Sequence, residues 1–342
     1  MSQISGVSIE RTGLVTSVGN NAPASCAAMR SKLTNPSETR FTNLHGEWIL
    51  AHQVQFATPL RRLRRLARMA AMAINECLEP IPASEWPTVP LILCLAERSR
   101  PNRHEKLDQL AGAIERELQA RFSPTSIVIA QGRVSVAVAL RQAQRMILGG
   151  EAAQVVIAAV DSLLDFRVLG AYEEDMRLLT AENSNGLMVG EAAGALLLTG
   201  RTDRQALRLM GTGFAREIAH VLSDAPLRAD GLAAAIREAL READMSFLDL
   251  DFRITDLSGE HYYFKEAALA VGRILHSLKD EFDLWHPAES VGETGAAAGA
   301  VMIALADAAC RQGFAPGDRI LIHMSADAGE RAAAVLQFGV DQ

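Results

Sequence analysis

The sequence predicts an α/β fold made of two similar halves, and three observations support this prediction. Residues 127–161 contain a short apolar run, a helix-forming stretch rich in small residues, a Gly-Gly-Glu turn and a second apolar run. This is the order of a strand–helix–strand crossover unit. Strand-like and helix-like stretches also alternate along most of the chain. Finally, the turn at residues 313–318 again follows an Ala-rich helix and precedes an apolar run. This echo predicts two related halves, residues 1–200 and 201–342, in one five-layered body.

Helices are predicted where apolar residues recur every three to four positions or where helix-start signals occur. Pro23 can occupy the first helical position of a helix that extends to about Leu33. The further predicted helices cover residues 60–78, 104–121, 134–148, 232–243, 264–278 and 295–309.

Strands are predicted where short β-prone or apolar runs lie between turn residues. These runs are residues 6–18, 47–56, 91–96, 127–130, 155–160, 207–214, 252–256, 319–323 and 332–338. Residues 187–199 are expected to form two short strands or one bent strand. Residues 34–46 are polar, and residues 163–177 are rich in acids and aromatics, so both segments are expected to be connections.

Composition narrows the possible functions. The chain has 342 residues, of which 49% are hydrophobic and 22% charged, as in an ordinary soluble globular protein. Its net charge of −7 argues against binding of nucleic acid or of an anionic membrane. No uncharged run approaches the roughly 18–20 apolar residues of a membrane helix. Neither the Cys nor the His residues show metal-ligand spacing, and no phosphate-binding Gly loop is present. We therefore expect a cytoplasmic protein with reduced thiols that needs no cofactor or metal.

Five segments, in order along the chain, resemble motifs of one enzyme family. They are residues 12–19 (TGLVTSVG), 134–161, 190–196 (GEAAGAL), 219–226 together with 231–240, and 292–299 (GETGAAAG). Together they are similar to the thiolase superfamily and, within it, to the beta-ketoacyl synthases. The resemblance covers nearly the whole chain and implies a thiolase-like fold, in which two βα halves form five αβαβα layers.

The positions that carry chemistry in these synthases are changed. The family has a Cys at the start of the central helix, where the helix dipole favours the thiolate that attacks an acyl thioester. Without gaps, that position falls on Arg133. The second of two basic groups that stabilise the developing oxyanion falls on Glu293, and His261 lies two to four residues late for the first. The terminal glycine-rich gate loop, residues 325–329, keeps only Gly329. The resemblance therefore implies a synthase-like protein without condensing activity.

The changed positions suggest a specific arrangement. Arg133 is predicted at a helix N-terminus, where the dipole disfavours a cation. Because the family fold brings the two positions together, we hypothesise a salt bridge between Arg133 and Glu293 that plugs the old site. The alternative is that Arg133 points to solvent. Gln131, His261 and His323 are candidates for relocated catalytic groups, whereas Asp161 and Glu191 are expected to brace loops. The arginines of residues 61–65 are expected to form a solvated helix face.

The favoured interpretation is a catalytically degenerate beta-ketoacyl synthase-like protein that acts as a partner subunit or protein-binding adaptor. Some bacterial accessory proteins reuse enzyme folds in this way. The family pairs the strand at residues 127–130 across a two-fold axis, which implies a homodimer or a heterodimer with a synthase-like chain. The alternative is an acyl-thioester enzyme, either a decarboxylase or an acyltransferase, that uses Gln131, His261 or His323.

Overall fold

The computed structural model describes residues 6–101, 105–201, 205–279 and 281–339. Its strands fall into two groups that repeat one pattern. The first group has the order β5 (Ile127–Ala130), β4 (Leu91–Leu95), β6 (Gln154–Ser162), β7 (Glu191–Thr199) and β1 (Val7–Val15). The second has the order β10 (Asp283–Trp285), β9 (Phe252–Thr255), β11 (Arg319–Ser325), β12 (Glu330–Phe338) and β8 (Leu207–Arg216).

The pairing directions repeat as well. In each group the first two pairings are parallel and the last two are antiparallel. A short antiparallel contact between β1 and β8, from Val7 to Ile9, joins the groups into one ten-stranded sheet. The division of the chain at residue 200 therefore stays a prediction, although the expected repetition is present in the order of the strands.

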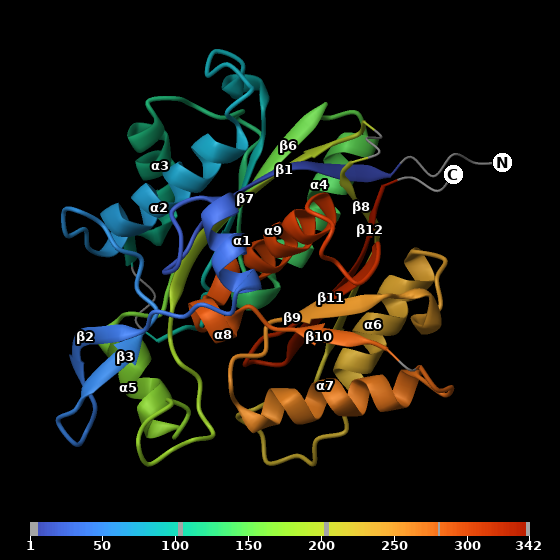
Figure 1. Ribbon diagram of the computed structural model, residues 1–342. Coiled ribbons are helices and arrows are strands. Elements are labelled where there is room, and N and C mark those ends of the chain that lie inside the picture. The colour runs from blue at the N-terminus through green and yellow to red at the C-terminus, as the bar shows by residue number, and fades with distance from the viewer. Residues whose placement is uncertain (1–5, 102–104, 202–204, 280, 340–342) are drawn as a thin grey trace.

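Helices form the layers around this sheet (Figure 1). The outer face of the first group is covered by α2 (Arg62–Cys77) and α3 (Leu110–Leu118), and that of the second by α6 (Asp230–Glu242) and α7 (His261–Ile274). Between the groups lie α4 (Ser135–Leu148) and α9 (Ala298–Arg311), which share one apolar cluster with strands of both groups. The body is thus five-layered, as predicted.

The two central helices pack between the strands through small and apolar residues. In α9 the buried side chains include most of the helix, among them Ala300, Ile303 and Ala306. In α4 they include Val136, Ala139 and other small or branched residues. A helix enclosed by sheets on two sides needs apolar residues around most of its circumference, and small residues allow the strands to approach closely.

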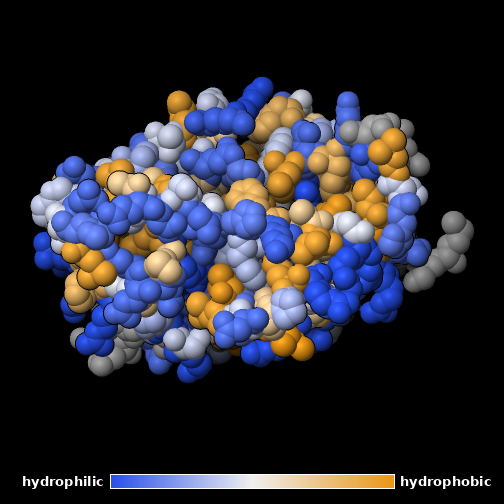
Figure 2. All heavy atoms as spheres, turned by 90° about the horizontal axis from the view of Figure 1, so that it is seen from below, coloured by the Kyte–Doolittle hydropathy of each residue, from blue (hydrophilic) through white to orange (hydrophobic). Residues whose placement is uncertain are grey.

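The remaining elements lie at the ends and edges of these layers. They are α1 (Ala22–Arg30), β2 (Ser37–Thr42), β3 (Trp48–Ala51), α5 (Phe166–Glu174), α8 (Ala288–Val291) and the 3₁₀ turns η1 (Trp86–Thr88), η2 (Glu105–Gln109), η3 (Gly132–Val134), η4 (Phe247–Asp249) and η5 (Gly295–Ala297). The strands β2 and β3 pair only with each other. Seen from below, the surface carries hydrophobic side chains in small groups that hydrophilic ones separate, so no apolar patch dominates that face (Figure 2).

Several local predictions were wrong. Residues 163–177 were expected to be a connection but contain α5, whose start is capped by the Asp165 carboxylate accepting the backbone N–H of Arg167. Residues 34–46 contain β2, and β7 is one continuous strand that starts at Glu191. The short strand β10 was not predicted. The predicted helix start at residue 104 lies outside the described residues. Across the described ranges, no helix has both the length and the apolar character that a membrane crossing requires.

Candidate functional site

The candidate site is built on two equivalent glycine turns at the starts of the central helices. Gly132 begins η3 before α4 with a φ of 57°, and Gly295 begins η5 before α9 with a φ of 55°. A Cβ on Gly132 would lie 2.3 Å from Oε2 of Glu97, and one on Gly295 would lie 2.1 Å from Oδ2 of Asp161. Both turns therefore require glycine for backbone conformation and for space. They bring the residues that follow them toward each other.

Arg133, in the first of these turns, is buried, with only 5% of its surface exposed. Its Nε lies 3.4 Å from Oε2 of Glu293, and its Nη2 lies 2.9 Å from Oδ1 of Asp327. Its Nη1 donates a hydrogen bond of 3.2 Å to the carbonyl of Ser325. The guanidinium also lies over the ring of Tyr263, 4.9 Å from its centroid. The hypothesised ion pair with Glu293 is present, and the alternative that Arg133 points to solvent is wrong.

A second buried arginine shares the same aspartate. Nε of Arg177 lies 2.7 Å from Oε1 of Glu260, and its Nη1 lies 2.8 Å from Oδ2 of Asp327. The hydroxyl of Tyr263 donates a hydrogen bond to Oδ1 of Asp327. Asp327 therefore joins two cations and a phenol, and it belongs to the turn between β11 and β12. We call Arg133, Arg177, Glu260, Tyr263, Glu293 and Asp327 the ion-pair cluster.

The charges of the cluster shift its pKa values in consistent directions. Burial alone would lower the pKa of Arg133, but the carboxylates of Glu293 and Asp327 outweigh it and hold that pKa well above its ordinary value. Burial would raise the pKa of Asp327, but Arg133 and Arg177 hold it well below its usual range. Burial raises the pKa of Glu293, and the nearby Arg133 only partly opposes this shift. Arg133 and Asp327 are thus firmly charged.

Backbone hydrogen bonds fix the acids at the start of α9. Oε1 of Glu293 accepts the N–H of Gly295 at 2.8 Å, and Oδ2 of Asp161 accepts that of Ala296 at 2.8 Å. These bonds satisfy N–H groups that have no partner within the helix, and a negative charge here suits the helix dipole. Asp161 also receives Nη1 of Arg100 at 2.7 Å. Asp161 braces the site, as the sequence suggested.

Neither candidate histidine reaches the cluster. His261 is exposed as the first residue of α7, where its backbone N–H donates to Oδ1 of Asn185 at 2.6 Å. His323 is buried in β11, and neither ring nitrogen has a hydrogen-bond partner. Strand alternation places it on the same side as Leu321, which packs with α6 rather than with the central helices. Burial lowers the pKa of His323 to about 3, so the ring is neutral.

A cavity of about 660 Å³ remains beside the cluster. Arg133 and Glu293 lie on its wall, together with Tyr172, Arg177 and Asp327. Gln131 is exposed and also lines it, whereas His261 and His323 do not. The ion pair therefore closes the start of α4 without filling the space in front of it. Among the described residues, no group of His, Cys, Asp and Glu is arranged to hold a metal ion.

Sequence reasoning missed several members of the cluster. Asp327 was noted only as part of the loop 325–329, which had lost glycines. A carboxylate in a loop that the resemblance places at the site could have been predicted as a partner for Arg133. Tyr263 carried no prediction, although it lies only two residues after His261. Arg177 was placed in a connecting segment, and its contact with Asp327 spans 150 residues of chain. No local pattern indicates such a contact.

Comparisons with known proteins identify the fold. No protein-family model and no curated protein sequence matches this chain. A ketosynthase in complex with its chain length factor from Xenorhabdus doucetiae matches with 15% identity and a TM-score of 0.79, covering 99% of both chains. The ishigamide ketosynthase/chain length factor matches with 17% identity and a TM-score of 0.79, covering 98% of this chain and 99% of that one. A type II polyketide ketosynthase in complex with its acyl-carrier protein matches with 16% identity and a TM-score of 0.80, covering 98% and 99%. The expected thiolase-like α/β fold is confirmed.

Proposed function

We propose that this chain, which has the fold of a ketosynthase or chain length factor, is a non-condensing partner subunit of a synthase-like protein. The observation that carries the proposal is the buried guanidinium of Arg133 at the start of α4, held by Glu293 and Asp327. In the family that the sequence resembles, this position holds the nucleophilic thiol.

The chemistry of the cluster does not suit condensation. A guanidinium stays protonated and offers no nucleophilic lone pair at physiological pH. Transition-state stabilisation of an acyl transfer needs donors directed at a developing oxyanion. The donors of Arg133 are instead directed at two carboxylates and the Ser325 carbonyl. Glu293 would add repulsion wherever it is ionised.

The edge of the sheet supports a role in pairing. The strand β5 lies at one end of the ten-stranded order, and Ile127 and Val128 are 38% and 46% exposed. An exposed apolar edge strand favours association with another chain. The similar solved structures described above include ketosynthases in complex with chain length factors. We propose that β5 of this chain pairs with a synthase-like chain or with a second copy.

A second candidate function is decarboxylation of a malonyl thioester. Gln131 lines the cavity of about 660 Å³, so its amide could donate to a bound thioester carbonyl. No histidine reaches that cavity among the described residues that line it. This candidate therefore relies on the amide of Gln131, without a histidine beside it among the residues that the structure describes.

The first experiment separates these functions. Purified protein is incubated with malonyl-coenzyme A, and the formation of the decarboxylation product acetyl-coenzyme A is followed by mass spectrometry. We expect wild type, Gln131→Ala and the control Gln312→Ala, which alters an exposed residue after α9, to give the same background rate. If the wild type and Gln312→Ala decarboxylate malonyl-coenzyme A and Gln131→Ala does not, the protein is instead a decarboxylase that uses Gln131.

A second experiment tests the pairing edge. Native mass spectrometry is applied to the protein alone and after co-expression with a synthase-like chain. We expect Val128→Asp to abolish the pair, because a charge on an apolar edge strand opposes sheet continuation. Leu148→Asp is the matched control, since Leu148 is 51% exposed at the end of α4. Loss of pairing in both variants, or in neither, would contradict pairing through β5.

A further inference from the structure

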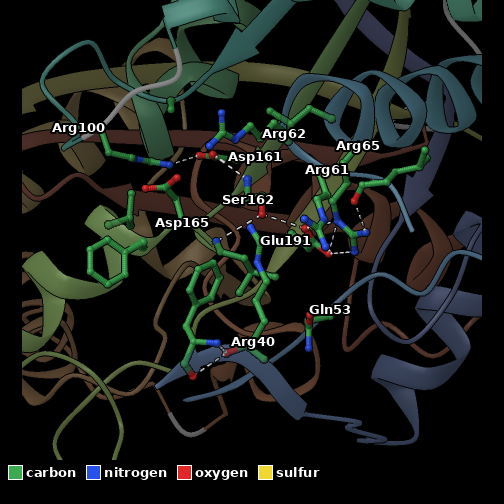
Figure 3. A pocket seen from close by; sticks show the side chains of 18 of the residues that line it. Arg40, Gln53, Arg61, Arg62, Arg65, Arg100, Asp161, Ser162, Asp165 and Glu191 are labelled. Atoms are coloured by element: carbon green, nitrogen blue, oxygen red, sulfur yellow. Dashed lines mark hydrogen bonds and ion pairs between the residues drawn. The ribbon is translucent and has the colours of Figure 1, made fainter. Parts of the chain in front are cut away.

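A second cavity, independent of the proposed function, lies between the β2–β3 hairpin and the starts of α2 and α5 (Figure 3). Its volume is about 350 Å³. Five arginines line it, namely Arg40, Arg61, Arg62, Arg65 and Arg100. This density of cations is unusual in a chain whose net charge is −7. The arginines at the floor of the cavity are paired with carboxylates, whereas those at its rim are not.

The floor of this cavity is electrically neutral. Nη1 of Arg100 lies 2.7 Å from Oδ2 of Asp161, and Nε of Arg65 lies 2.8 Å from Oε2 of Glu191. The hydroxyl of Ser162 donates to the same Glu191 oxygen at 2.9 Å. Figure 3 shows these groups joined across the back of the pocket. They form a hydrogen-bonded floor in which the arginine charges are already neutralised by carboxylates.

The rim, by contrast, carries unmatched positive charge. Within the part of the chain that the structure describes, Arg61 and Arg62 have no carboxylate partner, and the guanidinium of Arg40 has only the ring of Phe41, at 4.9 Å. Besides Asp161 and Glu191 at the floor, Asp165 lines the cavity, and its Oδ1 accepts the backbone N–H of Arg167 at 3.0 Å. Three cations thus face one carboxylate that already caps α5.

The form of these cations indicates the kind of anion. A guanidinium presents a planar fork of N–H donors that matches a phosphate group. Arg61 and Arg62 lie at the start of α2, whose first turn contains no acidic residue. Apolar side chains of Phe41, Leu66 and other residues line the same cavity. A ligand that satisfies both features has a dianionic head and a small apolar body.

We infer that this arginine pocket binds a small free organic phosphate monoester. The phosphate contacts Arg61, Arg62 and Arg40, and the organic part contacts the apolar lining. The volume of about 350 Å³ is at the lower end of the range for small-molecule sites. The expectation that the arginines of residues 61–65 form a solvated face holds for Arg61, Arg62 and Arg64, which are exposed, and fails for Arg65, which is partly buried and paired with Glu191. Of the three exposed arginines, Arg64 alone does not line the pocket.

The test is isothermal titration calorimetry with phenyl phosphate at pH 8, where a phosphate monoester carries almost two charges because its second pKa is about 6. We expect one saturable site in the wild type. Arg61→Gln and Arg62→Gln should each weaken binding about five- to ten-fold, since each removes a charge-assisted contact. Arg64→Gln, which removes the same charge from the same helix turn, should change the affinity less than about two-fold. Neutral benzyl alcohol should not bind.

Four outcomes would overturn the inference. One is the absence of saturable binding, and another is equal weakening by Arg64→Gln, which would indicate only a diffuse positive field. Binding of inorganic phosphate as tightly as phenyl phosphate would remove the role of the apolar lining. Binding of a polyglutamate peptide without binding of phenyl phosphate would assign the pocket to an acidic polypeptide. Thermal melting of each variant checks folding, and because the three side chains are exposed we expect unchanged stability.

Discussion

Oδ1 of Asp327 lies 2.9 Å from Nη2 of Arg133, although 194 residues separate them in the chain. The other oxygen of the same carboxylate lies 2.8 Å from Nη1 of Arg177. One aspartate in a short turn therefore connects the start of the central helix α4 with the segment after α5.

Asp327→Asn is expected to lower the free energy of unfolding by about 3–5 kcal/mol, because it removes the charge between two buried cations while keeping the shape. Urea unfolding measures this change. Glu330→Gln is the control, since its partner Arg216 lies 3.7 Å away and both side chains are exposed. That control should cost at most about 1 kcal/mol. Equal effects of the two substitutions would show that burial of the pairs contributes nothing.

A double-mutant cycle should detect coupling between Arg133 and Glu293. Arg133→Met leaves a buried carboxylate without its cation, and adding Glu293→Gln removes that penalty. We expect the double variant to be more stable than the sum of the single effects by about 1–3 kcal/mol. The exposed pair Arg11 and Glu79, 3.1 Å apart, provides a reference cycle with a coupling below about 1 kcal/mol. Strict additivity in the buried cycle would contradict the ion pair.

Asp256 should make stability depend on pH. Burial raises the pKa of this carboxyl to about 7, and its Oδ2 accepts the N–H of Ser325 at 2.8 Å. The folded state therefore keeps a proton that the unfolded state releases above about pH 4. This contribution to stability is complete below pH 4 and is lost as the pH rises through about 7.

Asp256→Asn should remove this dependence, which amounts to about 2–4 kcal/mol between pH 4 and 7. His323 acts in the opposite direction, because its folded pKa of about 3 gives stability that is lost as the pH falls below its unfolded value. The measurement is therefore the difference in unfolding free energy between wild type and variant at several pH values. Asp224→Asn, at an exposed position, is the control. A constant difference across this range would refute a proton held by Asp256.

Gly295→Ala should destabilise the protein by at least about 2 kcal/mol, since alanine disfavours a φ of 55° and its Cβ would displace the Asp161 carboxylate. Gly170→Ala is the matched control: it lies inside α5 with no atom within 4 Å of the added Cβ. The control should be neutral or stabilising by up to about 1 kcal/mol. Thermal unfolding of both variants measures the contrast. A Gly295→Ala protein as stable as the wild type would show that the turn tolerates a side chain.

The sequence predicted those parts of the fold in which buried elements follow one another directly in the chain. The segment containing β5, α4 and β6 consists of two apolar runs and a helix with one apolar face, so its pattern is visible locally. By contrast, α5 buries little beyond Val168 and Leu169, and its acidic composition hides it. The strands β2 and β10 are short and depend on pairing partners that a local pattern does not reveal.

The candidate site was predictable only where a resemblance supplied the register. That register brought Arg133 and Glu293 together correctly. His323 follows three apolar strand residues and looked like a site residue, but the two-residue period of β11 turns it toward the outer helices. Asp327 and Arg177 join the cluster through side-chain reach across distant segments, which sequence spacing does not encode.

The shared carboxylate of Asp327 also limits how the site can evolve. A thiol at position 133 would leave Glu293 and Asp327 without the cation between them, and a histidine at position 293 would remove one of the two carboxylates that neutralise Arg133. Each single step toward a nucleophilic site thus passes through a less stable protein, so several positions must change together. The cluster therefore opposes a conversion of this site to thiol chemistry by one substitution at a time.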